Sequence, residues 1–254
     1  MIKAFLYNLF VIFRYRYKVI EKNLNHTISS DPKETKALIN SFYKYLARLI
    51  YENLFIRITP KLSFNNLSFL KEDLQNNNGH LLLASHYGNW EMACTYLPTQ
   101  LQGIKVYGVY RPIKNKFIDL RIKKQRSRHG LILIPMKSIA RTIAKNHSEN
   151  VASVYILIAD QNPGSSKKMV WAEFLGVSTP FVNGPKKLLE RYKYNASYMK
   201  VTPNYSTFNY SIDIKKLSID PNHVMQDYAK QLEEQIKSKP AYWLWSHKRW
   251  KRVF

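Results

Sequence analysis

The sequence predicts an α/β fold: a single domain with a mostly parallel central sheet flanked by helices, preceded by an N-terminal amphipathic and hydrophobic helical segment. Short apolar runs typical of buried strands alternate with amphipathic stretches typical of helices through most of the chain. The 254 residues, 45% of them hydrophobic, are enough to bury one core. Because no internal repeat and no Pro/Gly/Ser-rich linker interrupts the chain, we divide it only into a helical segment, residues 1–58, and a main domain, residues 59–254.

The chain opens with a short apolar run, residues 4–13, whose one polar residue is Asn8. As a helix this run reaches about 15 Å, half of a hydrocarbon core. On a helical wheel Lys3, Arg14 and Lys18 share one side. The opposite side carries large apolar side chains, namely Phe5, Leu9, Ile12, Phe13 and Ile20. This pattern favours a shallow or in-plane membrane anchor over a spanning helix, and the alternative is a helix packed on its own domain.

The remaining elements follow from periodicity and capping. Residues 31–58 read as a helix, because Asp31 can cap it and Pro32 suits its first position. Strands are expected at 80–85, 105–109, 131–134, 154–159, 196–202 and 207–214. Helices are expected at 89–101, 115–128, 137–147, 184–194 and 221–238.

Polar loops follow three of these strands: residues 86–91 (HYGNWE), 110–115 (YRPIKN) and 160–164 (DQNPG). Ligands of parallel α/β sheets gather at the carboxyl ends of the strands. These loops bring an imidazole, two carboxylates and an arginine to that edge. The sequence therefore predicts a functional site there.

The pair His86 and Glu91, five residues apart around a Gly-Asn turn, is the strongest chemical signal. If the helix begins near Asn89, the turn can bring the Glu91 carboxylate back beside the imidazole. A carboxylate there fixes the tautomer of the ring and leaves the other nitrogen as a general base toward a hydroxyl.

A structural histidine is the competing interpretation of His86. The same spacing recurs at His26 and Asp31, in a polar stretch that no strand precedes. Other templates are absent: the chain has no G-x-S-x-G elbow, no phosphate-binding P-loop, no G-x-G-x-x-G and no H-E-x-x-H. The single cysteine, Cys94, excludes a disulfide framework and a multi-thiolate zinc site.

The net charge points to an anionic partner. Lys and Arg number 40 against 17 Asp and Glu, which gives 40 − 17 = +23. The basic clusters are interleaved with apolar and aromatic residues instead of forming one disordered tail. Composition alone leaves nucleic acid, an anionic membrane, a phosphorylated substrate and an acidic protein open.

Four ordered blocks carry a family resemblance: SHYGNWEMA (85–93), YRPIKNKFIDLRIKKQRSRHG (110–130), the stretch from DQNPG to GPKKLLER (160–191), and YWLWSHKRWK (242–251). Together they resemble the bacterial lipid A biosynthesis late acyltransferases, within the lysophospholipid-acyltransferase-like group and its H-x₄-[DE] motif. The resemblance covers nearly the whole chain.

The resemblance implies transfer of a fatty acyl group from acyl carrier protein to a hydroxyl of a lipid A precursor, a phosphorylated glycolipid, on the cytoplasmic face of the bacterial inner membrane. His86 would be the base and Glu91 its support, and a thioester donor requires no metal or other cofactor. Substrate-binding candidates are Arg111 and Arg126 for a phosphate or headgroup, with Asn89, Asp160 and Gln161 near the site. The alternative for Arg111 is an ion pair with an acid such as Asp160, and that for Asp160 and Gln161 is a strand-end cap.

Three other functions stay open at this point. The acceptor could be a lyso-phospholipid or an aminolipid, which the same machinery would serve. A basic nucleic-acid-binding protein fits the charge and the interleaved aromatics, but it leaves the context of His86 unexplained, so we expect no nucleic acid partner. A catalytically idle protein that only binds membranes is the third.

Overall fold

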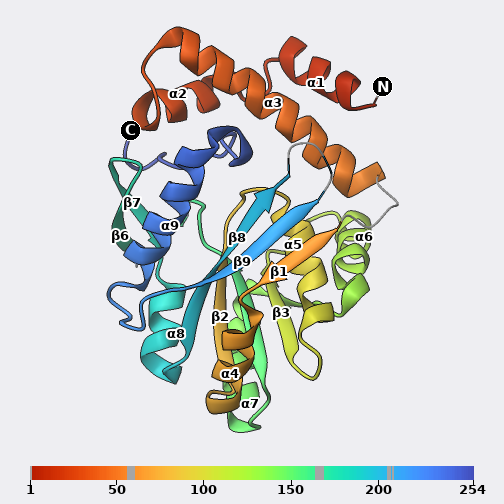
Figure 1. The fold of residues 1–254 in the computed structure, drawn as a ribbon, viewed down its shortest axis with the longest axis vertical. Helices are drawn as coiled ribbons and strands as arrows, with labels where there is room; N and C mark the ends of the chain where they lie inside the picture. The colour runs from red at the N-terminus through yellow and green to blue at the C-terminus, as the bar shows by residue number, and fades with distance from the viewer. Residues whose placement is uncertain (1, 56–60, 164–168, 205–206, 208) are drawn as a thin grey trace.

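The protein is described here from a computed structural model, which describes residues 2–55, 61–163, 169–204, 207 and 209–254. Its centre is a seven-stranded sheet in the order β1-β9-β8-β2-β5-β3-β4 (Figure 1). Only the β8–β9 pairing is antiparallel, so β2, β3, β4, β5 and β8 share one direction. The predicted α/β fold with a mostly parallel sheet is confirmed.

The strands of this sheet are β1 (Leu62–Asn65), β2 (Gly79–Ala84), β3 (Lys105–Tyr110), β4 (Ile132–Pro135), β5 (Ser153–Ile158), β8 (Asn195–Pro203) and β9 (Tyr210–Lys216). Each predicted strand is present within a few residues of its expected bounds. Sequence reasoning missed β1 and a separate antiparallel hairpin, β6 (Met169–Phe174) with β7 (Val177–Val182).

The helices are α1 (Ile2–Ile12), α2 (Tyr17–Thr27), α3 (Pro32–Phe55), α4 (Leu67–Asn76), α5 (Trp90–Tyr96), α6 (Lys116–Arg126), α7 (Ile139–Ser148), α8 (Gly184–Tyr192) and α9 (Val224–Ser238). Short 3₁₀ turns extend α5 and α6, so the longer helices predicted at 89–101 and 115–128 are each an α-helix followed by a 3₁₀ turn. The helix α4 was not predicted. The last residues of the helix predicted at 31–58, and the boundary between 58 and 59, lie outside the described residues.

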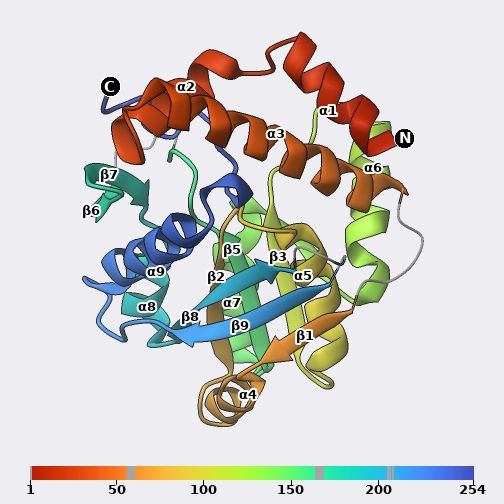
Figure 2. The same cartoon turned by 45° about the horizontal axis from the view of Figure 1, so that its top comes forward.

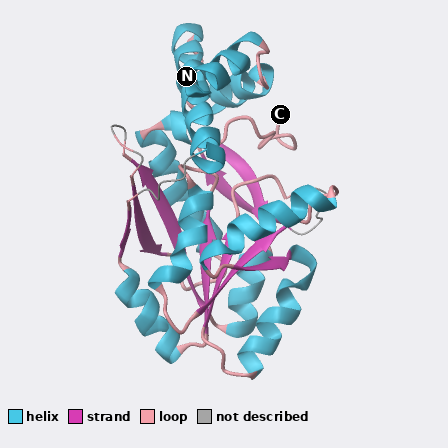
Figure 3. Cartoon of the chain, turned by 90° about the vertical axis from the view of Figure 1, so that its right-hand side faces the viewer, coloured by secondary structure: helices cyan, strands magenta, loops and turns pink. Residues whose placement is uncertain are grey.

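Helices cover both faces of the sheet because the side chains of each strand alternate between two cores (Figure 3). Along β2, Leu81 and Leu83 enter a core that also contains residues of α2, α3, α7, α8 and α9. Leu82 and Ala84 point the other way and pack with residues of α4 and α5. A strand that is apolar on both faces is typical of a doubly covered parallel sheet, which explains the unbroken apolar run of β2.

The start of the N-terminal helical segment consists of two helices, whereas the helical wheel over residues 3–20 treated it as one. Arg14 and Arg16 adopt left-handed backbone conformations and separate α1 from α2. As a result Ile20 is fully buried in α2, whereas no residue of α1 is buried. Across the described part of the chain, none of the helices combines the length and the apolar character needed to cross a membrane. The helices α1–α3 lie across the edge at which β2 and β5 end (Figures 1 and 2).

Candidate active site

The site forms where β2 and β5 end side by side. The two strands pair in parallel with Ala84 opposite Ile158, so the second residue beyond each strand end lies beside the other. These residues are His86 and Asp160. The register of the sheet therefore brings together two groups that are 74 positions apart in the sequence.

The Asp160 carboxylate is 2% exposed and accepts three hydrogen bonds. One oxygen accepts from His86 Nδ1 at 2.7 Å, and the other accepts from the His86 amide and from Trp243 Nε1, each at 2.8 Å. Burial by itself raises the pKa of Asp160, but the imidazole and these donors outweigh it, so the pKa lies below its ordinary value. Asp160 is therefore a buried carboxylate that stays ionised and orients the ring.

The hydrogen bond from Nδ1 to Asp160 places the ring proton on Nδ1 and leaves a lone pair on Nε2. Gln161 Nε2 lies 3.1 Å from His86 Nε2 and can donate to that lone pair. The His86 side chain is 16% exposed and meets Trp90 edge-on, with the ring centroids 5.0 Å apart. The nitrogen on the far side of the ring from Asp160 thus carries the lone pair, and Gln161 is its partner in the structure.

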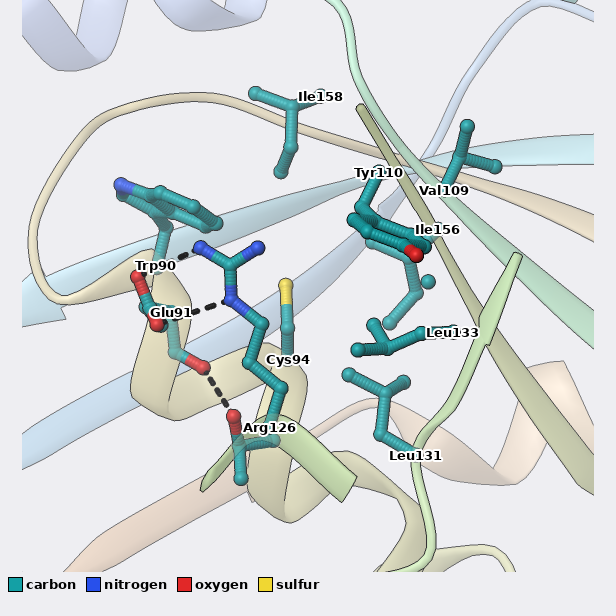
Figure 4. Close-up of a pocket in the computed structure, with 12 residues that line it drawn as sticks. Trp90, Glu91, Cys94, Val109, Tyr110, Arg126, Leu131, Leu133, Ile156 and Ile158 are labelled. Atoms are coloured by element: carbon teal, nitrogen blue, oxygen red, sulfur yellow. Dashed lines mark hydrogen bonds and ion pairs between the residues drawn. The ribbon is translucent and has the colours of Figure 1, made fainter. Parts of the chain in front are cut away.

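Glu91 does not have the predicted contact with His86. Instead it forms a bidentate ion pair with Arg126, with Oε1 to Nε at 3.0 Å and Oε2 to Nη2 at 3.2 Å (Figure 4). The prediction that Glu91 orients the imidazole is therefore wrong, because α5 begins at Trp90 and directs Glu91 toward α6 while the sheet register supplies Asp160. Arg126, predicted to bind a phosphate, is occupied by the same ion pair.

An apolar cleft of about 350 Å³, including its opening to solvent, lies beside this ion pair (Figure 4). Its lining is contributed by α5, β3, β4, β5 and the end of α6, namely Trp90, Glu91, Cys94, Thr95, Gly108, Val109, Tyr110, Arg126, Leu131, Leu133, Ile156 and Ile158. Burial raises the pKa of the Cys94 thiol to about 12, so this sulfur behaves as an apolar wall atom. Apart from the Glu91–Arg126 ion pair, the lining is mostly apolar, which is the chemical character of a surface that contacts an apolar chain.

Asn89 and Arg111, both predicted to contact substrate, differ in their surroundings. Asn89 is buried, caps α5 by accepting from the Met92 amide at 3.2 Å, and donates to Glu52 of α3 at 3.0 Å. Both ends of its amide thus hold the turn between His86 and Glu91 in place. Arg111 is exposed and forms no ion pair with any described residue, so the alternative pairing with Asp160 is not formed.

The closing segment of the chain completes the site in a way that sequence reasoning did not assign. Trp243 is the indole donor to Asp160, and the Leu244 amide donates to the His86 carbonyl at 3.2 Å. Arg249 is fully buried against Phe181, with its guanidinium 4.4 Å from the ring centroid. Burial lowers the pKa of Arg249 to about 10. The available signal was the block YWLWSHKRWK (242–251), which contains these residues.

Within the described ranges, no three His, Cys, Asp or Glu side chains are grouped so as to hold a metal ion.

A doubly covered parallel sheet with a histidine–aspartate pair at the carboxyl ends of its strands is the arrangement of an α/β enzyme. The family model described as bacterial lipid A biosynthesis acyltransferase matches residues 4–252, nearly the whole chain. The chain therefore belongs to this family and is an acyltransferase of lipid A biosynthesis, as the resemblance implied. Among curated proteins, none matches the chain significantly.

Proposed function

We propose that the protein transfers a fatty acyl chain from an acyl carrier protein thioester to a hydroxyl of a phosphorylated lipid A precursor, with His86 as the general base. The observation that carries this proposal is the His86–Asp160 pair, whose imidazole ring packs edge-on against Trp90, a residue that lines the apolar cleft. Acyl transfer accounts for the imidazole base and for the apolar cleft beside it, and it is the reaction of the family to which the chain belongs.

In the proposed reaction, His86 Nε2 takes the proton of the acceptor hydroxyl as its oxygen attacks the thioester carbonyl carbon. The C–S bond then breaks, the new C–O ester remains, and the carrier thiolate recovers the proton from the imidazolium. Asp160 holds the ring in the required tautomer and stabilises the imidazolium. Gln161 must leave Nε2 for the hydroxyl to bind there, and it can do so by rotating its side chain.

The cleft is the proposed position of the acyl chain. Leu131, Leu133, Ile156 and Ile158 give it aliphatic walls, and the Glu91–Arg126 ion pair is its polar part. Glu91 then acts on the site through Arg126, by neutralising and fixing the guanidinium, and not through His86. We propose that neither a metal nor another cofactor takes part, because a thioester is already an activated acyl donor.

The charge of the chain supports the proposed partners. At +23, the protein attracts an acidic carrier protein, the phosphates of the acceptor and anionic lipid headgroups alike. The outer face of α1 exposes Ile2, Phe5 and Ile12, which is consistent with a peripheral position on the cytoplasmic face of the inner membrane. Exposed Arg111 remains a proposed headgroup or phosphate contact.

The test is mass spectrometry of lipids from a reaction that contains purified protein, acylated carrier protein and a lipid A precursor. We expect a gain of one acyl mass, absent with His86→Ala and with Asp160→Asn. Full activity of His86→Ala would refute the base assignment. Acylation of a lyso-phospholipid but not of the lipid A precursor would refute the acceptor while leaving the reaction class intact.

A further inference from the structure

The outer face of α6 carries large apolar side chains where a surface helix ordinarily carries polar ones. Phe117 is 74% exposed and Leu120 is 65% exposed, and they lie three residues apart on one face. The inner face instead buries Asp119, which accepts from the Ile113 amide at 2.9 Å and pairs with Lys123 at 2.7 Å. Leaving these apolar groups in water is unfavourable, so a contiguous exposed patch of this kind marks an interaction surface.

Positive charge surrounds this apolar face. Within residues 111–128 there are eight Lys and Arg and one acid, Asp119. Lys123 pairs with Asp119 and Arg126 with Glu91. The other six are exposed and form no ion pair with described residues; they are Arg111, Lys114, Lys116, Arg121, Lys124 and Arg128. Arg121 and Lys124 share the helix face of Phe117 and Leu120, so apolar and cationic groups are presented together.

The helix α6 lies on the same side of the molecule as the start of α1 and the end of α3 (Figures 1 and 2). A hydrogen bond joins two of these elements: Gln125 of α6 donates to the Asn53 carbonyl of α3 at 3.0 Å. The start of α1 exposes Ile2 and Phe5, and the end of α3 exposes Leu54. Three separate elements on this side of the molecule thus expose apolar side chains.

We infer that α6 is a membrane-docking helix, and that its outer face inserts Phe117 and Leu120 into the interface of an anionic bilayer beside α1. A bilayer is the occupant that matches both halves of the surface, since its acyl boundary accepts apolar side chains and its headgroups accept unpaired cations. An acidic protein would satisfy the cations on α6, but it would not account for the apolar side chains that α1 and α3 also expose.

This docking surface rests on the proposed function only for the presence of a membrane, and it adds a structural consequence. Arg126 is the last residue of α6 and lines the cleft. A bilayer against the outer face of α6 therefore lies one helix away from the place proposed for the acyl chain. As a docking element in addition to α1, α6 would hold the cleft close to the lipid surface.

The experiment uses a fluorophore that responds to its surroundings, NBD, attached to an introduced cysteine. The only native cysteine, Cys94, is buried with a raised pKa, so Leu120→Cys provides the reactive thiol. The matched control is Ile219→Cys, an aliphatic position that is 78% exposed. It belongs to the segment before α9, which lies on the opposite side of the molecule from α6 (Figure 1). The probes are phosphatidylcholine vesicles with and without phosphatidylglycerol, and acyl carrier protein alone.

We expect the label at 120 to shift to shorter wavelength and brighten several-fold on vesicles that contain phosphatidylglycerol, while the label at 219 stays in water. A label at 120 that stays in water on bound vesicles would overturn the inference. So would an equal response at 219, or a response at 120 to acyl carrier protein and not to vesicles.

A variant without a label keeps the inference testable independently. In vesicle sedimentation, Phe117→Ser/Leu120→Ser should weaken binding by about tenfold or more, and Ile219→Ser should leave it unchanged. These assays contain no substrate. Unchanged vesicle binding of the double variant, with acyl transfer intact in the parent protein, would therefore refute the docking surface alone. Insertion of the label at 120 into vesicles without any acyl transfer would refute the proposed function alone.

Discussion

Two histidines flank β2, one at each end, and each directs Nδ1 at an aspartate. At the carboxyl end, His86 bonds Asp160 at 2.7 Å; at the amino end, His80 bonds Asp73 at 2.6 Å. The His80 ring continues to Ser197, with Nε2 at 2.9 Å from the hydroxyl, in the order of an Asp-His-Ser triad. Yet His80 is 1% exposed and Ser197 is fully buried, so no substrate reaches either.

The comparison shows that a carboxylate partner does not by itself make a histidine catalytic. Both imidazoles are oriented by an aspartate whose pKa lies below its ordinary value; for each, burial acts to raise the pKa, and the histidine and other hydrogen-bond donors outweigh it. What differs is the second nitrogen. Nε2 of His80 is hydrogen-bonded to the buried Ser197. Nε2 of His86 contacts Gln161, and the His86 side chain is partly exposed.

The largest expected difference is in activity. His86→Ala should lower acyl transfer by about 10²- to 10⁴-fold, because the general base is lost. The fold should persist, since the ring is partly exposed. The measurement is initial rate with acylated carrier protein, alongside a circular dichroism spectrum. An active His86→Ala protein would remove the functional distinction between the two histidines.

Asp160→Asn should cost on the order of 10²-fold or more in rate, because an amide no longer fixes the Nδ1–H tautomer or supports the imidazolium. Asp73→Asn is the matched control at the other end of β2, and its activity per folded molecule should match that of the wild type. A comparable rate loss in both variants would mean that the two pairs are not separable in function.

His80→Ala should act on stability instead. It leaves Asp73 and Ser197 without their shared partner in the interior, which should lower the free energy of unfolding by about 2 kcal/mol. Urea denaturation gives this quantity. Turnover per folded molecule should not change, and a fall in turnover without a fall in stability would contradict the structural role.

The smallest effect is on the acid dependence of stability. A carboxyl pKa that is depressed in the folded state contributes stability above its unfolded value, about 4, and that contribution disappears as pH falls through the folded value. Stability should therefore decline below about pH 4. The decline should be shallower in His80→Ala and in His86→Ala, because each loses a group that depresses an aspartate. Equal slopes in all three proteins, measured by urea denaturation at stepped pH, would refute this linkage.

The sequence predicted the position of His86 but not its partner. The apolar run of β2 and the loop after it place the histidine at a strand end, where periodicity is informative. Spacing favoured Glu91, five residues away, because local patterns contain no information on strand order. In the sheet β5 lies between β2 and β3, and this long-range pairing supplies Asp160. The break in the N-terminal helix was likewise hidden, since arginine seldom adopts the left-handed conformation found at Arg14 and Arg16.

Glu52 gives the N-terminal helices a second task. Its buried carboxylate accepts from Asn89, Arg48 and the Tyr210 hydroxyl, and thereby ties α3 to the turn that carries His86. Without α3, the Asn89 amide and the Tyr210 hydroxyl would lose their acceptor, Glu52, inside the protein. The helix α3, whose end is hydrogen-bonded to the proposed docking helix α6, thus also anchors the turn that carries His86. A tilt of α3 on a membrane would therefore change the alignment of the imidazole.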